Sequence, residues 1–154
     1  MNSSSTVHDT MVLERVYAVD VTRVFAAWSH PDAKRVWFSG EDGGGEYSLD
    51  FRVGGRELSR ATLEGGGDVY TYDAVYQDIV PGRRLVYTNH MLRNADRISV
   101  SLTSVEFLPD PAGTRLVLTE HGVYLDGLDQ PEYRRQGIAQ QLEALDALLS
   151  EGAR

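Results

Sequence analysis

The sequence predicts an α+β fold in which a curved antiparallel sheet wraps around one long C-terminal helix. The first reason is helical periodicity over residues 131–149, where apolar residues recur at spacings of three and four along one face. These residues are Ile138, Leu142, Leu145 and Leu149. The second reason is that residues 47–121 alternate with a period of two between glycine and proline turns, which is typical of strands joined by hairpins. An antiparallel sheet that is covered on one face curves around its cover, so we expect the helix to pack on the concave side.

The N-terminal part of the chain is expected to form one strand and two short helices. Residues 11–19 alternate as a strand does, with apolar groups on both faces. Asp20 is suited to cap a helix whose apolar residues are three and four positions apart. Pro31 ends this helix and opens a second short one, which carries Trp37 and Phe38.

Six consecutive strands follow in the prediction, each joined to the next by a turn. The strands are expected at residues 47–53, 56–63, 69–80, 84–92, 98–108 and 114–121. A loop at 41–46 precedes them, Gly54-Gly55 is expected to form a two-residue hairpin turn, and Pro81-Gly82 is another turn signal. Further turns are expected at 64–68 and 109–113. Because consecutive hairpins pair neighbouring strands, the six strands are antiparallel and the predicted order is β-α-α-β6-α.

The last helix has its own start and stop signals, and it closes a single domain. Asp129 and Pro131 suit the start of a helix, and Gly152 suits its end. A chain of 154 residues is the size of one ordinary domain. We expect this domain to cover residues 10–154, after a flexible polar N-terminal tail at residues 1–9.

Composition excludes several classes of function. The net charge of −8 argues against general binding of nucleic acid or of anionic membranes. The chain has no cysteine, so disulfides, thiolate metal sites and cysteine nucleophiles are excluded. No stretch approaches the apolar length that a membrane span needs, and the serine-rich N-terminus does not resemble a signal peptide. A cytoplasmic protein is therefore expected.

Several segments carry a resemblance to a known family. They are residues 24–28 with Pro31 and Trp37 after them, residues 50–55, residues 80–88 and residues 113–121. In this order the segments resemble the activator of heat-shock-protein-90 ATPase homologue-like branch of the START-related (SRPBCC, polyketide cyclase-like) superfamily. The resemblance runs from about Thr10 to Leu149 and implies the helix-grip (START-like) fold. It also implies a carrier of hydrophobic ligands, with cyclases and hydrolase-like proteins in the wider superfamily.

The sequence departs from this family in two places. Members often carry Gly-Trp in the last helix, where this chain has Gly137-Ile138. The eukaryotic co-chaperones also have a separate N-terminal docking domain, whereas only a polar tail is expected before this fold. A chaperone ATPase, and with it a role in the stress response, is therefore the least favoured partner that the resemblance implies.

Aromatic side chains and the parity of two strands suggest a ligand site between sheet and helix. If Leu118 faces inward, Glu120 does so as well, and on a neighbouring strand Tyr87 shares a face with Asn89. The candidate ligand-binding residues are Trp28, Trp37, Phe38, Tyr72, Tyr76, Tyr87, Asn89, Leu102, Leu118, Glu120 and Arg134. The rings can equally well complete the core, and a β-bulge would turn His90 or His121 inward instead.

Arg134 is open to three interpretations, because it lies one turn before Ile138 on the apolar face of the helix. It can meet a ligand carboxylate, pair with Glu120, or extend its charged end into solvent. No two histidines have a metal-binding spacing, and Ser29, His30 and Asp32 are too close in sequence to face one another as a triad. We therefore expect no metal, no cofactor and no catalytic residue.

Three functions are open, in decreasing order of preference. The first is a binding protein that holds a small hydrophobic or amphipathic ligand in a cavity between sheet and helix. The second is a cyclase- or hydrolase-like enzyme that uses Glu120, His90 or Tyr87 for proton transfer. The third is a co-chaperone-like regulator of a chaperone ATPase. The chain could also form a homodimer.

Overall fold

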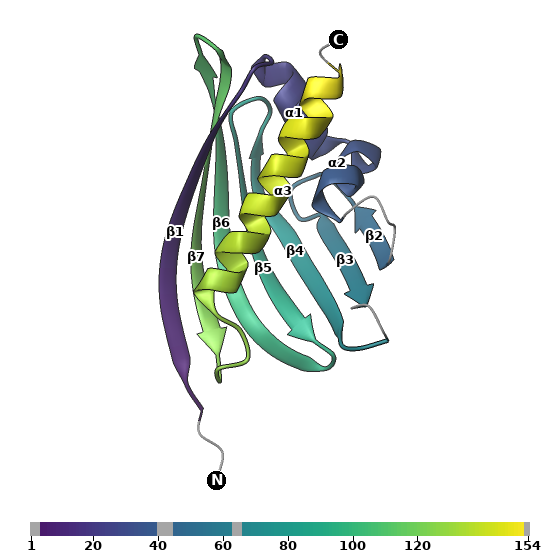
Figure 1. Ribbon diagram of the computed structural model, residues 1–154, viewed down its shortest axis with the longest axis vertical. Helices are drawn as coiled ribbons and strands as arrows, with labels where there is room; N and C mark the ends of the chain where they lie inside the picture. Colours follow the sequence, from purple (N-terminus) through teal and green to yellow (C-terminus); the bar gives the residue numbers. More distant parts are fainter. Residues whose placement is uncertain (1–3, 40–44, 63–65, 153–154) are drawn as a thin grey trace.

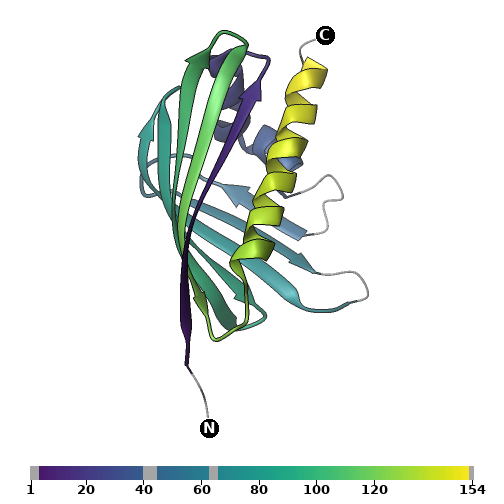
Figure 2. The same ribbon diagram turned by 60° about the vertical axis from the view of Figure 1, so that its left-hand side comes forward.

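A seven-stranded antiparallel sheet curves around a long C-terminal helix in the computed structural model, which describes residues 4–39, 45–62 and 66–152 (Figure 1). The elements in order are β1 (Thr6–Tyr17), α1 (Val21–Ser29), α2 (Pro31–Phe38), β2 (Gly45–Leu49), β3 (Arg56–Thr62), β4 (Val69–Val80), β5 (Arg84–Arg93), β6 (Asp96–Asp110), β7 (Gly113–Leu125) and α3 (Pro131–Gly152). The strand order is β1-β7-β6-β5-β4-β3-β2. Helix α3 crosses the concave side of the sheet, with α1 and α2 beside its C-terminal half (Figure 2). The predicted helix-grip fold class and its β-α-α-β6-α order are confirmed.

The predicted N-terminal tail is too long. β1 begins at Thr6, well before the expected residue 11, and Thr6 lies opposite Leu125 of β7. β7 continues beyond the expected residue 121, so its backbone is available to pair with residues 6–9. The prediction of a tail over residues 1–9 is therefore wrong for residues 6–9, which form the start of an edge strand.

The first hairpin has a wider turn than predicted. β2 ends before residue 50, so residues 50–55 form the turn instead of two glycines alone. Gly54 has a φ of 84°, and its N–H donates to the carbonyl of Tyr76 at 2.8 Å. Phe51 lies in this turn, and its ring packs edge-on against Phe25 with 5.8 Å between centroids. The turn thus fastens the hairpin to β4 and to α1.

The remaining element bounds agree with the predictions except for a few terminal residues. The Asp20 side chain accepts a hydrogen bond from the N–H of Arg23 at 3.0 Å, which is the expected cap of α1. Pro31 opens α2, and α3 extends to Gly152. The predicted loop at 41–46 and turn at 64–68 fall partly on residues 41–44 and 64–65, which lie outside the described residues.

The apolar face of α3 forms the centre of the core. Its predicted members Ile138, Leu142, Leu145 and Leu149 are all buried. Tyr17 of β1 fixes the helix from the sheet side, because its buried hydroxyl donates to the carbonyl of Leu142 at 3.1 Å. The predicted packing of the helix on the sheet is therefore confirmed.

Truncating this face at its most buried point should destabilise the fold. Leu145 has no exposed surface, so Leu145→Ala is expected to lower the free energy of unfolding by about 2–5 kcal/mol, through lost burial and the cavity left behind. Urea denaturation followed by circular dichroism measures the change. Leu148→Ala on the same helix is the control, because Leu148 is only partly buried and should cost clearly less. Equal costs for the two variants would contradict this account of the core.

Candidate functional site

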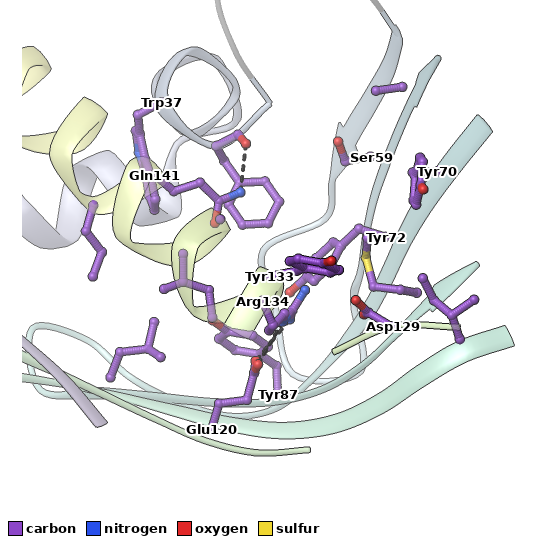
Figure 3. A pocket seen from close by; sticks show the side chains of 18 of the residues that line it. Trp37, Ser59, Tyr70, Tyr72, Tyr87, Glu120, Asp129, Tyr133, Arg134 and Gln141 are labelled. Atoms are coloured by element: carbon purple, nitrogen blue, oxygen red, sulfur yellow. Dashed lines mark hydrogen bonds and ion pairs between the residues drawn. The ribbon is translucent and has the colours of Figure 1, made fainter. Parts of the chain in front are cut away.

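A partly enclosed cavity of about 320 Å³ lies between α3 and the concave face of the sheet (Figure 3). Its wall takes side chains from α1, α2, strands β3 to β7 and the first half of α3. A space of this size is suited to a small molecule, because ligand pockets in proteins span roughly 300–1,000 Å³. The sheet and the helix therefore leave room for a ligand between them.

One part of the cavity is a wall of aromatic rings. Trp28 and Trp37 pack edge to face with 4.7 Å between ring centroids, and Phe38 packs in the same way on Tyr72 at 5.0 Å. The indole N–H of Trp37 donates to the carbonyl of Ala27 at 2.9 Å, which fixes α2 against α1. Because these rings hold one another in place, they offer a rigid apolar surface to a ligand.

A charged pair forms the polar part of the wall. Arg134 of α3 donates from Nε to Glu120 Oε2 at 2.7 Å and from Nη2 to Glu120 Oε1 at 3.0 Å. The same Nη2 donates to Asn89 Oδ1 at 2.9 Å, and the Thr103 hydroxyl donates to Glu120 Oε1 at 2.6 Å. Asn89 Nδ2 closes the network by donating to Thr103 Oγ1 at 3.0 Å. The network therefore joins α3 to three neighbouring strands of the sheet, β5, β6 and β7.

The network fixes the charges of its two ionisable members. Burial raises the pKa of the Glu120 carboxyl, but the charge and hydrogen bonds of Arg134 outweigh burial and hold this pKa below its ordinary value. Burial lowers the pKa of the Arg134 guanidinium, and the Glu120 carboxylate more than reverses this change. At neutral pH the pair is a carboxylate and a guanidinium, and it carries no net charge.

Two tyrosines, Tyr72 of β4 and Tyr87 of β5, lie in the same part of the cavity as Arg134 (Figure 3). Burial raises the pKa of both phenols well above the ordinary value, and so do nearby groups, among them Glu120 in the case of Tyr87. Among the residues that the structure describes, neither hydroxyl has a hydrogen-bond partner. A protonated phenol can donate one hydrogen bond and accept another, so both groups are available to a ligand.

Asp129 and Tyr133 complete the wall at the N-terminal end of α3. The Asp129 carboxylate accepts a hydrogen bond from the N–H of Gln130 at 2.8 Å, and burial raises its pKa. Tyr133 is exposed over 61% of its surface, so it lies at the rim and not in the interior. This rim is therefore more polar than the aromatic wall.

The buried phenols predict a loss of stability in alkali. In the unfolded chain a tyrosine ionises near its ordinary pKa of 10.0, whereas Tyr72 and Tyr87 stay protonated in the folded state. Above about pH 10 the folded state therefore binds more protons than the unfolded state, and the free energy of unfolding should fall as the pH rises. Urea unfolding at increasing pH, with tyrosinate absorbance as a second readout, measures this. Tyr72→Phe should flatten the decline, and a wild-type midpoint that does not move would contradict the prediction.

Most predicted site residues lie on the cavity wall. Those that line it are Trp28, Trp37, Phe38, Tyr72, Tyr87, Leu118, Glu120 and Arg134. Asn89 lies behind this wall and acts on it through its hydrogen bond with Arg134. The parity argument thus placed the inward faces of β5 and β7 correctly.

Two predicted site residues lie elsewhere. Leu102 is 46% exposed, because it lies opposite Thr88 and His121 on the outer face of the sheet, and its selection as a ligand-binding residue is wrong. Tyr76 is fully buried and faces inward, but its hydroxyl donates to Glu57 at 2.9 Å outside the cavity. Tyr76 is therefore part of the core and not of the ligand site.

The alternatives for the histidines and for Arg134 are now resolved. His90 and His121 face the outer side of the sheet, where His90 lies 3.7 Å from Asp73 and His121 contacts Thr10 at 3.0 Å. The pairing of β5 with β6 shifts after Met91, because Ile98 of β6 is an extra residue there, and this shift does not turn His90 inward. Arg134 pairs with Glu120, and the interpretation that its charged end extends into solvent is wrong, because only 13% of its side chain is exposed.

Sequence reasoning missed a second charged pair, which lies under the aromatic wall. Lys34 of α2 and Glu57 of β3 are both 1% exposed, and Lys34 Nζ lies 3.0 Å from Glu57 Oε2. Tyr47 and Tyr76 also donate to Glu57, and the ammonium group lies 4.5 Å from the centre of the Phe38 ring. Lysine and glutamate are rarely buried, and no local pattern marks these two as exceptions.

Sequence reasoning also missed further residues of the cavity wall. They are Ser59, Ala61, Met91, Ile98, Asp129, Tyr133, Gly137, Gln141 and Leu142. Gly137 and Gln141 lie one and two turns after Arg134, so the face of the helix that includes Arg134 was the signal that could have found them.

Over the described ranges, no three acidic or histidine side chains come together as metal ligands would, and no helix is long and apolar enough to cross a membrane.

The fold and the cavity define a class: a helix-grip protein with an aromatic and partly polar cavity between its sheet and its C-terminal helix. A sequence model of the family described as Activator of Hsp90 ATPase homolog 1-like protein matches residues 18–150. The chain belongs to this family. No curated protein matches the chain.

Solved structures extend the likeness over the whole domain. An uncharacterized protein from Rhizobium leguminosarum is 42% identical, with a TM-score of 0.93 over 97% of this chain and 99% of that chain. A protein from Rhizobium loti is 43% identical, with a TM-score of 0.87 over 93% and 98% of the two chains. A protein from Chromobacterium violaceum is 26% identical, with a TM-score of 0.76 over 91% and 96%. These likenesses support the fold and leave the function to be argued from the site.

Proposed function

We propose that this protein binds a small amphipathic molecule in the cavity between α3 and the sheet and releases it unchanged. The observation that carries the proposal is a cavity of about 320 Å³ that combines an aromatic wall with unpartnered hydroxyls. Ligand pockets typically join a mostly apolar lining to a few well-placed polar groups. Here Tyr72 and Tyr87 supply the polar groups, and Trp28, Trp37 and Phe38 supply the apolar surface.

The chemistry of the cavity supports binding better than catalysis by the residues first considered. A general base needs a pKa near the working pH and a free lone pair. The pKa of Glu120 is held low, and both of its oxygens accept hydrogen bonds from Arg134. The raised pKa of Tyr87 keeps this phenol protonated, and His90 lies outside the cavity.

A ligand screen tests the proposal. Thermal shift measurements and displacement of the uncharged dye Nile red, applied to lipids, aromatic polyketides and hormone-like acids, should reveal compounds that raise the melting temperature and release the dye. The variant Gly137→Trp, whose cavity should be filled by the indole, is the matched control. The same compounds should not change the melting temperature of this variant. If no compound shifts the melting temperature and the dye does not bind, the proposal is wrong.

Proton-transfer catalysis is a second candidate, and Asp129 is the observation that favours it. This carboxyl lines the cavity, and burial raises its pKa toward the range of a general base. If Asp129 acts as a base, a bound ketone should exchange the hydrogens next to its carbonyl for deuterium in heavy water, as nuclear magnetic resonance would show. Asp129→Asn should abolish the exchange and leave the dissociation constant unchanged. Equal exchange with both proteins would exclude this role.

A further inference from the structure

We infer that the cavity selects ligands whose polar end is an uncharged hydroxyl or carbonyl group and rejects carboxylates. This inference rests on the proposed function and adds to it the chemical class of the ligand. It depends on the pairing of Arg134, on the acidic groups around it and on the two free hydroxyls nearby.

The positive charge of Arg134 is already balanced within the protein. Two of its nitrogens donate to the two oxygens of Glu120, at 2.7 and 3.0 Å. Because this fork uses the guanidinium charge on Glu120, a ligand carboxylate would find no unpaired cation here. Only 1% of the Glu120 side chain is exposed, so this pair is desolvated and its two charges interact strongly. Nη1, the remaining nitrogen of Arg134, has no partner within the described ranges and can still donate to a ligand oxygen.

A carboxylate ligand would enter this site at a disadvantage. It would lose its hydration next to the Glu120 carboxylate, and Asp129 adds a further acidic group to the same wall. Desolvating an anion is unfavourable unless an uncompensated cation receives it, and the lining offers none among the described residues. The binding of an acid would require Arg134 to leave Glu120, which would then remain buried and unpaired.

An uncharged polar group avoids these costs. The hydroxyls of Tyr72 and Tyr87 can donate to the oxygen of an alcohol or ketone, and either can accept a hydrogen bond from an alcohol. The Cζ atom of Arg134 lies 5.6 Å from the centre of the Tyr72 ring. Nη1, which is bonded to Cζ, is therefore on the same side of the cavity as Tyr72. An ammonium group at this position would instead face the guanidinium, which repels it.

A matched set of probes tests the inference on the wild-type protein. Naphthylmethanol, naphthoate and naphthylmethylammonium share one ring system and differ in the charge of the attached group. Competition with Nile red should show that naphthylmethanol binds at least about tenfold more tightly than either charged probe. If Nile red and all three probes fail to bind, the proposed function itself fails. If naphthoate binds as tightly as naphthylmethanol, the proposed function stands and the inference is overturned.

Glu120→Gln is the decisive variant, because it keeps the shape of the side chain and removes its charge. The freed Arg134 should then raise the affinity for naphthoate by about tenfold or more and change that for naphthylmethanol little. The double variant Glu120→Gln/Arg134→Met, which lacks both charges, should not show this gain. Arg134→Gln should do the opposite, weakening naphthoate further and favouring naphthylmethylammonium.

Circular dichroism establishes that each variant is folded before binding is measured. Should Glu120→Gln fail to fold, the wild-type comparison and Arg134→Gln still test whether the cavity prefers uncharged ligands to carboxylates. Tight binding of naphthylmethylammonium to the wild type, with loss of that binding in Asp129→Asn, would show that Asp129 at the rim is a cation site and would overturn the inference.

Discussion

Replacing Lys34 with methionine is expected to lower the free energy of unfolding by about 3–5 kcal/mol. Methionine can fill the space of the lysine stem, but it leaves the Glu57 carboxylate buried without its cation. Lys34 Nζ lies 3.0 Å from both oxygens of Glu57, and both side chains are 1% exposed. Tyr47 and Tyr76 would still donate to the carboxylate, but two neutral hydrogen bonds do not replace a full positive charge.

Urea denaturation of the variant measures this effect. Arg115→Met is the matched control, because Arg115 pairs with Glu14 at 3.5 Å on the surface. The two side chains are 43% and 55% exposed, so little stability should be lost. The double variant Lys34→Met/Glu57→Leu should recover much of the loss, since it removes the unpaired charge along with its partner. If Lys34→Met costs no more than Arg115→Met, the buried pair does not have the role assigned to it.

The buried pair also sets the shape of the ligand cavity. Lys34 belongs to α2 and Glu57 to β3, so their contact fixes the short helix on the sheet. The ammonium group lies 4.8 Å from the ring centre of Trp28 and 4.5 Å from that of Phe38, both of which line the cavity. Lys34 therefore helps to position the rings that a ligand would contact, although it does not line the cavity itself.

The fold could be predicted because its signals are local. The apolar face of α3 repeats within one helix, and each hairpin is indicated by residues that are consecutive in the chain. The inward faces of β5 and β7 followed from parity alone, which brought Tyr87 and Glu120 to the cavity. These features needed no knowledge of distant contacts.

The errors arise where the burial of a residue depends on contacts between elements that are distant in the sequence. Leu102 is among the predicted ligand-binding residues, but the register of β6 with β5 and β7 places it on the outer face of the sheet. Glu57 of β3 is buried, whereas its neighbour Leu58 is only half-buried. The reason is that Lys34 of α2, which is 23 residues earlier in the chain, covers Glu57. A pairing of that kind depends on how α2 docks on the sheet, and no pattern within either element encodes it.

Gly137→Trp is expected to abolish ligand binding while the protein stays folded. Gly137 lines the cavity, and a Cβ added there would meet no atom within 4 Å, so a larger side chain has open space to occupy. The residue lies on α3 one turn after Arg134 and lines the cavity, so an indole ring there would occupy the volume that the proposed ligand needs. We expect the affinity for Nile red to fall by about a hundredfold or more, which corresponds to the loss of roughly 3 kcal/mol.

Gly137→Ala separates this steric effect from the effect on the helix. Glycine in a helix interior is less stable than alanine by about 0.5–1 kcal/mol, so Gly137→Ala should raise the free energy of unfolding by this amount. Its single methyl group should leave dye binding nearly unchanged, because the space around it is open. Titration of Nile red and urea denaturation of both variants test the two effects separately. If Gly137→Trp binds the dye as well as Gly137→Ala does, ligands bind outside this cavity, and the site would have to be sought elsewhere on the molecule.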